Sequence, residues 1–67
     1  MSHEDAKKQA LKIGQYIVDI YGATIEDVVF MENGNIMIYA DEHGEKFCCE
    51  FTPKEWSDYA KESGVIK

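Results

Sequence analysis

The hydrophobic positions of this chain recur with two different periods, and the change of period separates its elements. From residue 3 to residue 21 they recur every three or four positions, which predicts an amphipathic helix. Ser2 is a suitable N-cap, and Gly22 can end the helix in the left-handed conformation. The expected buried stripe comprises Ala6, Ala10, Ile13, Ile17 and Ile20, widened by Leu11, Gly14, Val18 and Tyr21.

The middle of the chain has the alternating pattern of β-strands, interrupted by two turn signals. Asn33-Gly34 is a strong signal for a two-residue hairpin loop, and His43-Gly44 is a weaker one. The expected strands cover residues 26–32, 35–41 and 45–51, and they form an antiparallel meander.

The clearest local signal comes after the third strand. Thr52 is an N-cap residue, Pro53 fits the first helical position, and Glu55 completes a capping box with Thr52. A second helix is therefore expected over residues 53–63, with Gly64 as its stop. Residues 1–67 are predicted to form one small α+β domain, a three-stranded antiparallel β-meander with an N-terminal and a C-terminal helix.

The two turns also predict which strand residues share a face of the sheet. One face is continuously apolar and should be covered by both helices: Val29, Met31, Ile36, Ile38, Ala40, Phe47, Cys49 and Phe51. The other face should be open, with an apolar centre and a charged rim that are typical of an interface. It comprises Glu26, Val28, Phe30, Met37, Tyr39, Asp41, Lys46, Cys48 and Glu50. Two alternatives are that the first helix folds over this face, or that it is ordinary sheet surface.

Charge narrows the choice of partner. The chain has thirteen acidic residues and seven basic ones, all lysine, for a net charge of −6. This balance argues against direct nucleic-acid binding, which depends on basic patches and arginine forks. The segment from Asp19 to Glu50 contains eight acidic residues and only one lysine. The acids at the hairpin ends (Glu32, Asp41, Glu42 and Glu45) can attract a protein with a basic surface, although exposed turns also collect acids without any such role.

No catalytic, cofactor or metal site is expected. Cys48 and Cys49 are adjacent, so in a strand they point to opposite faces and do not bridge each other. Their spacing is not that of a zinc site, and His43 at a turn should lie too far from Cys48 to activate it. No catalytic motif, signal peptide or membrane span is visible, and we expect a cytoplasmic protein without enzymatic activity.

In its size, acidity, lack of arginine and order of elements, the chain resembles small phage-encoded inhibitors of bacterial defence, such as anti-CRISPR proteins. The resemblance covers the whole chain but includes no diagnostic motif, so it transfers no functional residue. It implies an inhibitor, in some cases a nucleic-acid mimic, that occupies a basic surface of a nucleic-acid-handling complex in the host cytoplasm. The alternative is a self-associating module that dimerises through the open sheet face. The residue patterns place partner binding at Glu26, Val28, Phe30, Glu32, Met37, Tyr39, Asp41, Glu42, Glu45 and Glu50.

Overall fold

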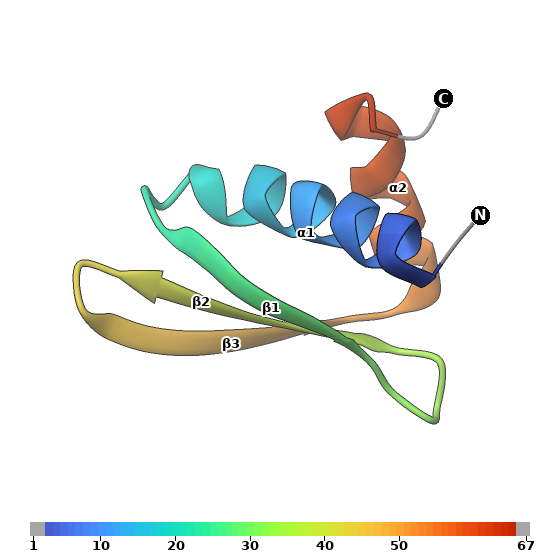
Figure 1. The fold of residues 1–67 in the computed structure, drawn as a ribbon, viewed down its shortest axis with the longest axis horizontal. Helices are drawn as coiled ribbons and strands as arrows, with labels where there is room; N and C mark the ends of the chain where they lie inside the picture. The colour runs from blue at the N-terminus through green and yellow to red at the C-terminus, as the bar shows by residue number, and fades with distance from the viewer. Residues whose placement is uncertain (1–2, 66–67) are drawn as a thin grey trace.

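A computed structural model describes residues 3–65 of the chain and confirms the expected fold. Its strands form one antiparallel sheet in the order β1-β2-β3, and both helices lie on the same side of that sheet (Figure 1). The N-cap expected at Ser2 lies outside the described residues. The elements in chain order are α1 (His3–Asp19), β1 (Thr24–Phe30), β2 (Ile36–Glu42), β3 (Glu45–Phe51) and α2 (Pro53–Ser63).

The end of α1 is fixed by a glycine motif. Gly22 has φ +71°, which only glycine adopts without strain. Its N–H donates to the Asp19 carbonyl at 3.0 Å, and the N–H of Ala23 donates to the Val18 carbonyl at 3.3 Å. This is the Schellman arrangement, and it buries Val18 and Ala23. The helix therefore ends at Asp19, two residues before the expected end, because Ile20 and Tyr21 already belong to the turn.

The start of α2 is the capping box that the sequence predicts. The Thr52 hydroxyl accepts from the Glu55 N–H at 3.2 Å, while the Thr52 N–H donates to the Glu55 carboxylate at 2.9 Å. Gly64 ends the helix with φ +80°. Trp56 is buried, and its ring packs against Phe51 with a centroid distance of 6.3 Å. The capping box thus sets the direction of α2 as it leaves the sheet.

The β2–β3 hairpin also agrees with the prediction. His43 has φ +52° and Gly44 has φ +92°, as a two-residue loop of this type requires. Ile36 lies opposite Phe51, Ile38 opposite Cys49, and Ala40 opposite Phe47, all in the expected register.

The β1–β2 hairpin differs from the prediction. Gly34 donates to the Met31 carbonyl at 3.0 Å, and Met31 donates to the Asn35 carbonyl at 2.8 Å. Gly34 alone in this loop has a positive φ, while the Asn33 side chain accepts from the Asn35 N–H at 3.0 Å. The loop therefore has three residues, the next most common hairpin form, and the two-residue turn predicted at Asn33-Gly34 is wrong.

The extra loop residue shifts the register of β1 by one position, so the residues near the loop point to the opposite face from the one predicted. Val28 now lies opposite Ile38 and is 1% exposed in the core, whereas Val29 lies opposite Met37 on the other face and is 41% exposed. The predicted faces of Val28 and Phe30 and of Val29 and Met31 are therefore wrong. Residues 28–31 are all apolar, so hydrophobic alternation is satisfied equally well by either register.

A β-bulge at Glu26 completes the core face of β1. Ile25 lies opposite Ala40 and Asp27 opposite Tyr39, which leaves Glu26 as the extra residue. Because of the bulge, Ile25 and Val28 both reach the helix side although they are three positions apart. Both approach Gly14 of α1: a Cβ atom there would lie 2.9 Å from Ile25 Cδ1 and 3.3 Å from Val28 Cγ2. The missing side chain of Gly14 lets α1 pack closely on β1.

The core is built from the middle of α1, the centre of the sheet and one side of α2. The α1 stripe is buried over Ala10, Ile13, Ile17 and Val18, as expected. Three residues expected in the stripe are exposed: Ala6, Ile20 (83%) and Tyr21 (60%). Ile20 and Tyr21 follow the last helical residue, so the helical period no longer directs their side chains to the covered side.

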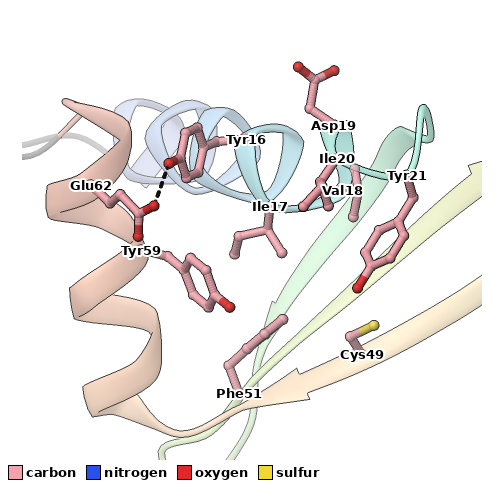
Figure 2. Close-up of a pocket in the computed structure, with 10 residues that line it drawn as sticks. All are labelled: Tyr16, Ile17, Val18, Asp19, Ile20, Tyr21, Cys49, Phe51, Tyr59 and Glu62. Atoms are coloured by element: carbon pink, nitrogen blue, oxygen red, sulfur yellow. Dashed lines mark hydrogen bonds between the residues drawn. The ribbon is translucent and has the colours of Figure 1, made fainter.

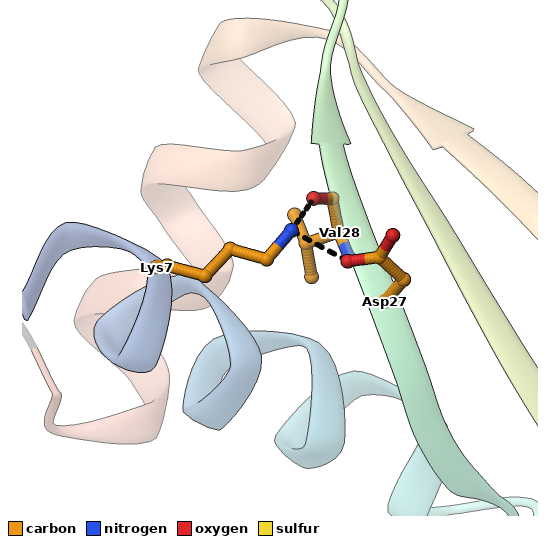
Figure 3. Close-up of polar contacts among 3 residues, drawn as sticks. All are labelled: Lys7, Asp27 and Val28. Atoms are coloured by element: carbon orange, nitrogen blue, oxygen red, sulfur yellow. Dashed lines mark hydrogen bonds and ion pairs between the residues drawn. The ribbon is translucent and has the colours of Figure 1, made fainter. Parts of the chain in front are cut away.

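The outer edge of β1 is closed by side chains (Figure 3). The Lys7 ammonium donates to the Val28 carbonyl at 2.6 Å and to the Asp27 carboxylate, which in turn accepts from the Val28 N–H at 2.9 Å. Farther along, the Gln15 amide accepts from the Ile25 N–H at 2.9 Å and donates to the Ala23 carbonyl at 3.0 Å. These contacts occupy backbone groups that another strand would need for pairing.

We expect Thr52→Ala to destabilise the protein by about 1 kcal/mol, because the first turn of α2 loses its N-cap. In a domain of this size that corresponds to a fall in Tm of roughly 4–8 °C, measured by circular dichroism. Ser57→Ala, at an exposed position inside the same helix, is the matched control and should leave Tm nearly unchanged. An equal fall in both variants would contradict the role of the capping box.

Candidate protein-interaction site

The side of the sheet that faces away from the helices presents an apolar strip that crosses all three strands. Tyr39 is 42% exposed and Val29 41% exposed, with the half-buried Met37 opposite Val29. Cys48, opposite Tyr39, is exposed as well. Neither helix lies on this side (Figure 1). We call this surface the uncovered face: Val29, Met37, Tyr39, Cys48 and Glu50, with Glu26, Asp41 and Lys46 at one end.

At the charged end of the uncovered face, two carboxylates share one lysine. Lys46 Nζ lies 2.6 Å from a Glu26 carboxylate oxygen and 3.2 Å from an Asp41 oxygen. The hydrogen bonds to Glu26 and Asp41 raise the pKa of Lys46. The pKa of Asp41 is lowered, first by the Gly44 N–H that donates to it at 2.7 Å and then by Lys46. Glu26 and Asp41 are therefore already paired, which weakens their predicted role toward a partner.

Three other predicted acids lie in or beside the two hairpin turns. Within residues 3–65, Glu32, Glu42 and Glu45 have no hydrogen bond or ion pair to a side chain of the protein. Glu42 and Glu45 lie directly opposite each other beside the His43-Gly44 turn, where like charges repel. Glu32 lies in the other turn, at the opposite end of the sheet (Figure 1). The unneutralised charge is thus concentrated at the two hairpin ends.

The structure brings together only part of the predicted site. Glu26, Met37, Tyr39, Asp41 and Glu50 share the uncovered face, and Glu50 also accepts a hydrogen bond from the Asn35 amide at 2.7 Å. Val28 is in the core and is excluded. Phe30 lies opposite the buried Ile36, on the helix side by register, but its ring is 59% exposed near the hairpin end. Val29 belongs to the surface and was assigned to the core instead.

A second apolar surface, which the sequence did not predict, is a groove of about 520 Å³ between the end of α1, β3 and α2 (Figure 2). Exposed or half-buried side chains line it, mainly Ile20, Tyr21, Phe51 and Tyr59. At its border the Tyr16 hydroxyl donates to Glu62 at 2.8 Å, and this bond raises the pKa of Tyr16. The sequence signal for the groove is Gly22, because residues in a glycine-terminated last turn leave the helical stripe.

Within residues 3–65, no group of three or more His, Cys, Asp or Glu side chains is placed to hold a metal ion. Both cysteines are free, with Cys48 exposed and Cys49 half-buried. No helix in the described part of the chain is both long and apolar enough to cross a membrane.

No protein-family model, curated protein or solved structure matches this chain. Its function has to be inferred from its own surface.

Stability should fall in acid because three carboxyl groups have lowered pKa values. Asp27 is held by Lys7, Asp41 by the Gly44 N–H, and Glu55 by the Thr52 N–H. Unfolding returns these groups to ordinary values near 3.8 for aspartate and 4.5 for glutamate. A lowered folded-state pKa stabilises the protein above the unfolded value, and this contribution is lost as pH falls through the folded value.

We therefore expect the urea midpoint to fall as pH decreases below about 4.5, and to fall less steeply in Asp27→Asn. Asp58→Asn is the matched control, since within residues 3–65 its carboxylate has no hydrogen-bonding partner. A pH profile of Asp27→Asn that matches the wild type while its stability is unchanged would contradict the role of the Lys7 contact.

Proposed function

We propose that this protein is a non-enzymatic acidic binding protein that inhibits a nucleic-acid-handling complex by occupying one of its basic surfaces, as anti-CRISPR proteins do. The observation that carries the proposal is the uncovered face itself. Its apolar centre at Tyr39, Met37 and Val29 lies between two hairpin ends. Three acids at these ends, Glu32, Glu42 and Glu45, have no counter-charge in the described chain. The proposed site of action is the cytoplasm, that of the host if the protein is encoded by a phage.

The acids supply attraction to a basic partner. Glu42 and Glu45 repel each other across the β2–β3 turn, and a cation from a partner would remove that repulsion. The nearby Lys46 does not do so, because it is engaged by Glu26 and Asp41. Surface charges of this kind speed association with an oppositely charged partner and make binding sensitive to salt.

The apolar centre supplies the part of the interface that excludes water. Tyrosine is enriched among the residues that dominate binding energy, because it buries a large ring and keeps a polar end. Tyr39 lies in the middle strand. A partner that covers it also reaches Met37, two residues away on the same strand, and Val29, which pairs with Met37. Acidic ends around an apolar centre match a basic groove with an apolar floor.

Direct binding to nucleic acid is not part of the proposal. The net charge is −6 and the chain has no arginine, so its field repels phosphates. A protein that normally binds DNA or RNA has the opposite field, and it would be attracted to the hairpin ends.

The test measures inhibition of target-DNA binding by a panel of purified CRISPR effector complexes. We expect one complex to be inhibited, and the charge reversal Glu42→Lys with Glu45→Lys to weaken that inhibition by at least about tenfold at low salt. Glu4→Lys with Asp58→Lys is the matched control, because it changes net charge equally at exposed positions on the two helices.

Tyr39→Lys should abolish inhibition at any salt concentration, with folding verified by circular dichroism. Inhibition that both double variants weaken equally would show that only net charge matters and would contradict the assigned surface. The absence of inhibition across the panel would overturn the proposed target class.

A further inference from the structure

The two edge strands differ in whether their outward backbone groups are hydrogen-bonded. Lys7 and Asp27 occupy the outward backbone groups of Val28 (Figure 3), and Gln15 occupies the outward N–H of Ile25. Along β3, none of the hydrogen bonds found outside the sheet among residues 3–65 reaches an outward backbone group between positions 45 and 51. β3 is therefore an edge strand with free donors and acceptors, which is a template for another strand.

The register identifies which backbone groups are free. In a two-residue hairpin the residues that flank the loop, here Glu42 and Glu45, bond to each other, and bonded pairs then alternate along the ladder. The Met31–Asn35 bond in the other hairpin leads to the same assignment. It shows that the backbone groups of Asn35 point toward β1, so those of the next residue, Ile36, point toward β3. The N–H and C=O groups that point away from β2 are those of Lys46, Cys48 and Glu50.

These three outward positions are self-complementary. If a second copy of β3 pairs antiparallel with the first and the two-fold axis passes through Cys48, Lys46 of each copy lies opposite Glu50 of the other. Opposite charges in directly facing positions stabilise a strand pair. The Lys46 side chain is 66% exposed, so it can approach the partner's Glu50 while it stays near Glu26 and Asp41, and Glu50 would share its carboxylate between Asn35 and the partner. A shift of the axis to Lys46 or to Glu50 would instead place identical charges opposite each other. Charge therefore favours the register centred on Cys48, the one that places Lys46 opposite Glu50, over those centred on Lys46 or Glu50.

We propose that the protein forms a homodimer through the β3 edges, paired antiparallel about Cys48, so that two three-stranded sheets become one six-stranded sheet. The contact is made by the outward backbone edge of β3 and not by the apolar centre around Tyr39, although the side chains of Lys46, Cys48 and Glu50 also belong to the uncovered face. The dimer does not depend on the inhibitor function proposed above. Antiparallel pairing keeps the side-chain faces in phase, so both sets of helices lie on one side of the combined sheet.

Apolar side chains next to the edge add to the backbone bonds. On the helix side, Phe47 is half-buried and contacts Tyr21 edge-to-face, with ring centroids 6.3 Å apart. In the proposed register Phe47 lies opposite Cys49 of the partner subunit. The groove lined by Ile20, Tyr21 and Cys49 runs along this edge of the sheet (Figure 2). A second β3 would partly cover the exposed apolar residues Ile20 and Tyr21.

The register is tested with two charge variants, Lys46→Glu and Glu50→Lys, by sedimentation equilibrium over a range of concentrations. Each variant alone places like charges opposite each other twice per dimer, so we expect dimer affinity to fall at least about tenfold. In an equimolar mixture every facing pair is again of opposite charge, and a heterodimer should form with nearly wild-type affinity. Tyr39→Lys, on the uncovered face, should leave the dimer unchanged.

Cross-linking gives an independent readout that needs no charge change. Facing residues in a bonded antiparallel pair have Cα atoms about 5.5 Å apart, within the range of a disulfide. Diamide, which takes up the two electrons and two protons lost by the two thiols, should link Cys48 to Cys48 in wild type and in Cys49→Ser. The covalent dimer should disappear in Cys48→Ser.

Three results would overturn the proposal: a wild-type protein that stays monomeric at every concentration, single charge variants that dimerise as well as wild type, or a mixture that dimerises no better than either variant alone. Loss of the dimer in Tyr39→Lys but not in Glu50→Lys would assign it to the uncovered face, which also contradicts pairing through β3. None of these outcomes depends on finding an inhibited complex, so the two proposals fail separately.

Discussion

The close contact of Gly14 with Ile25 and Val28 determines how the two layers of this molecule fit together. Because Gly14 has no side chain, α1 approaches β1 so closely that a Cβ atom would crowd the Ile25 side chain. Ile25 and Val28 reach the same side only because Glu26 forms a bulge between them. That close approach also brings Gln15 and Lys7 to the outer edge of β1, where they hydrogen-bond to its backbone.

The position of α1 over β1 has a consequence at the other edge of the sheet. Residues 3–65 form two helices and three strands, and α1 lies over the first strand of the sheet. α2 reaches the third strand only near Phe51, where Trp56 and Tyr59 pack on its ring. The rest of the β3 side therefore has a groove above it and an open edge beside it. Small domains bury a limited fraction of their surface, so apolar area remains for a partner.

The elements that the sequence predicted well are those fixed by local backbone chemistry. The Thr52–Glu55 capping box, the stop at Gly64 and the two-residue turn at His43-Gly44 each depend on a few neighbouring residues. The turn with the stronger sequence signal, Asn33-Gly34, was wrong. Asn33 uses its side chain to accept from the Asn35 N–H instead of adopting a positive φ. Both turn types accommodate this dipeptide, so the choice between them required tertiary information.

The candidate site was predictable only in part for the same reason. A hydrophobic pattern fixes a strand's face when polar residues alternate with apolar ones, as they do around Tyr39 and Glu50. In β1 residues 28–31 are all apolar, so the pattern does not show which of them face the core. Packing against α1 determines which side chains are buried. Val28 and Val29 consequently exchange their predicted places. The exposure of Ile20 was also hidden, since a helical stripe does not reveal where the sheet beneath it ends.

The two proposed surfaces are compatible and would reinforce each other. An antiparallel β3 pair places the Glu42–Glu45 turn of one copy and the Glu32 turn of the other at the same end of the six-stranded sheet. Their centres would be three strand spacings apart, about 14 Å for strands that lie 4.7–4.9 Å from their neighbours. Each end would then carry the Glu42–Glu45 pair of one copy and Glu32 of the other, and the two uncovered faces would form one surface. A basic groove long enough to contact both acidic positions would bind the dimer more tightly than the monomer, because the second contact is made without a second loss of translational freedom.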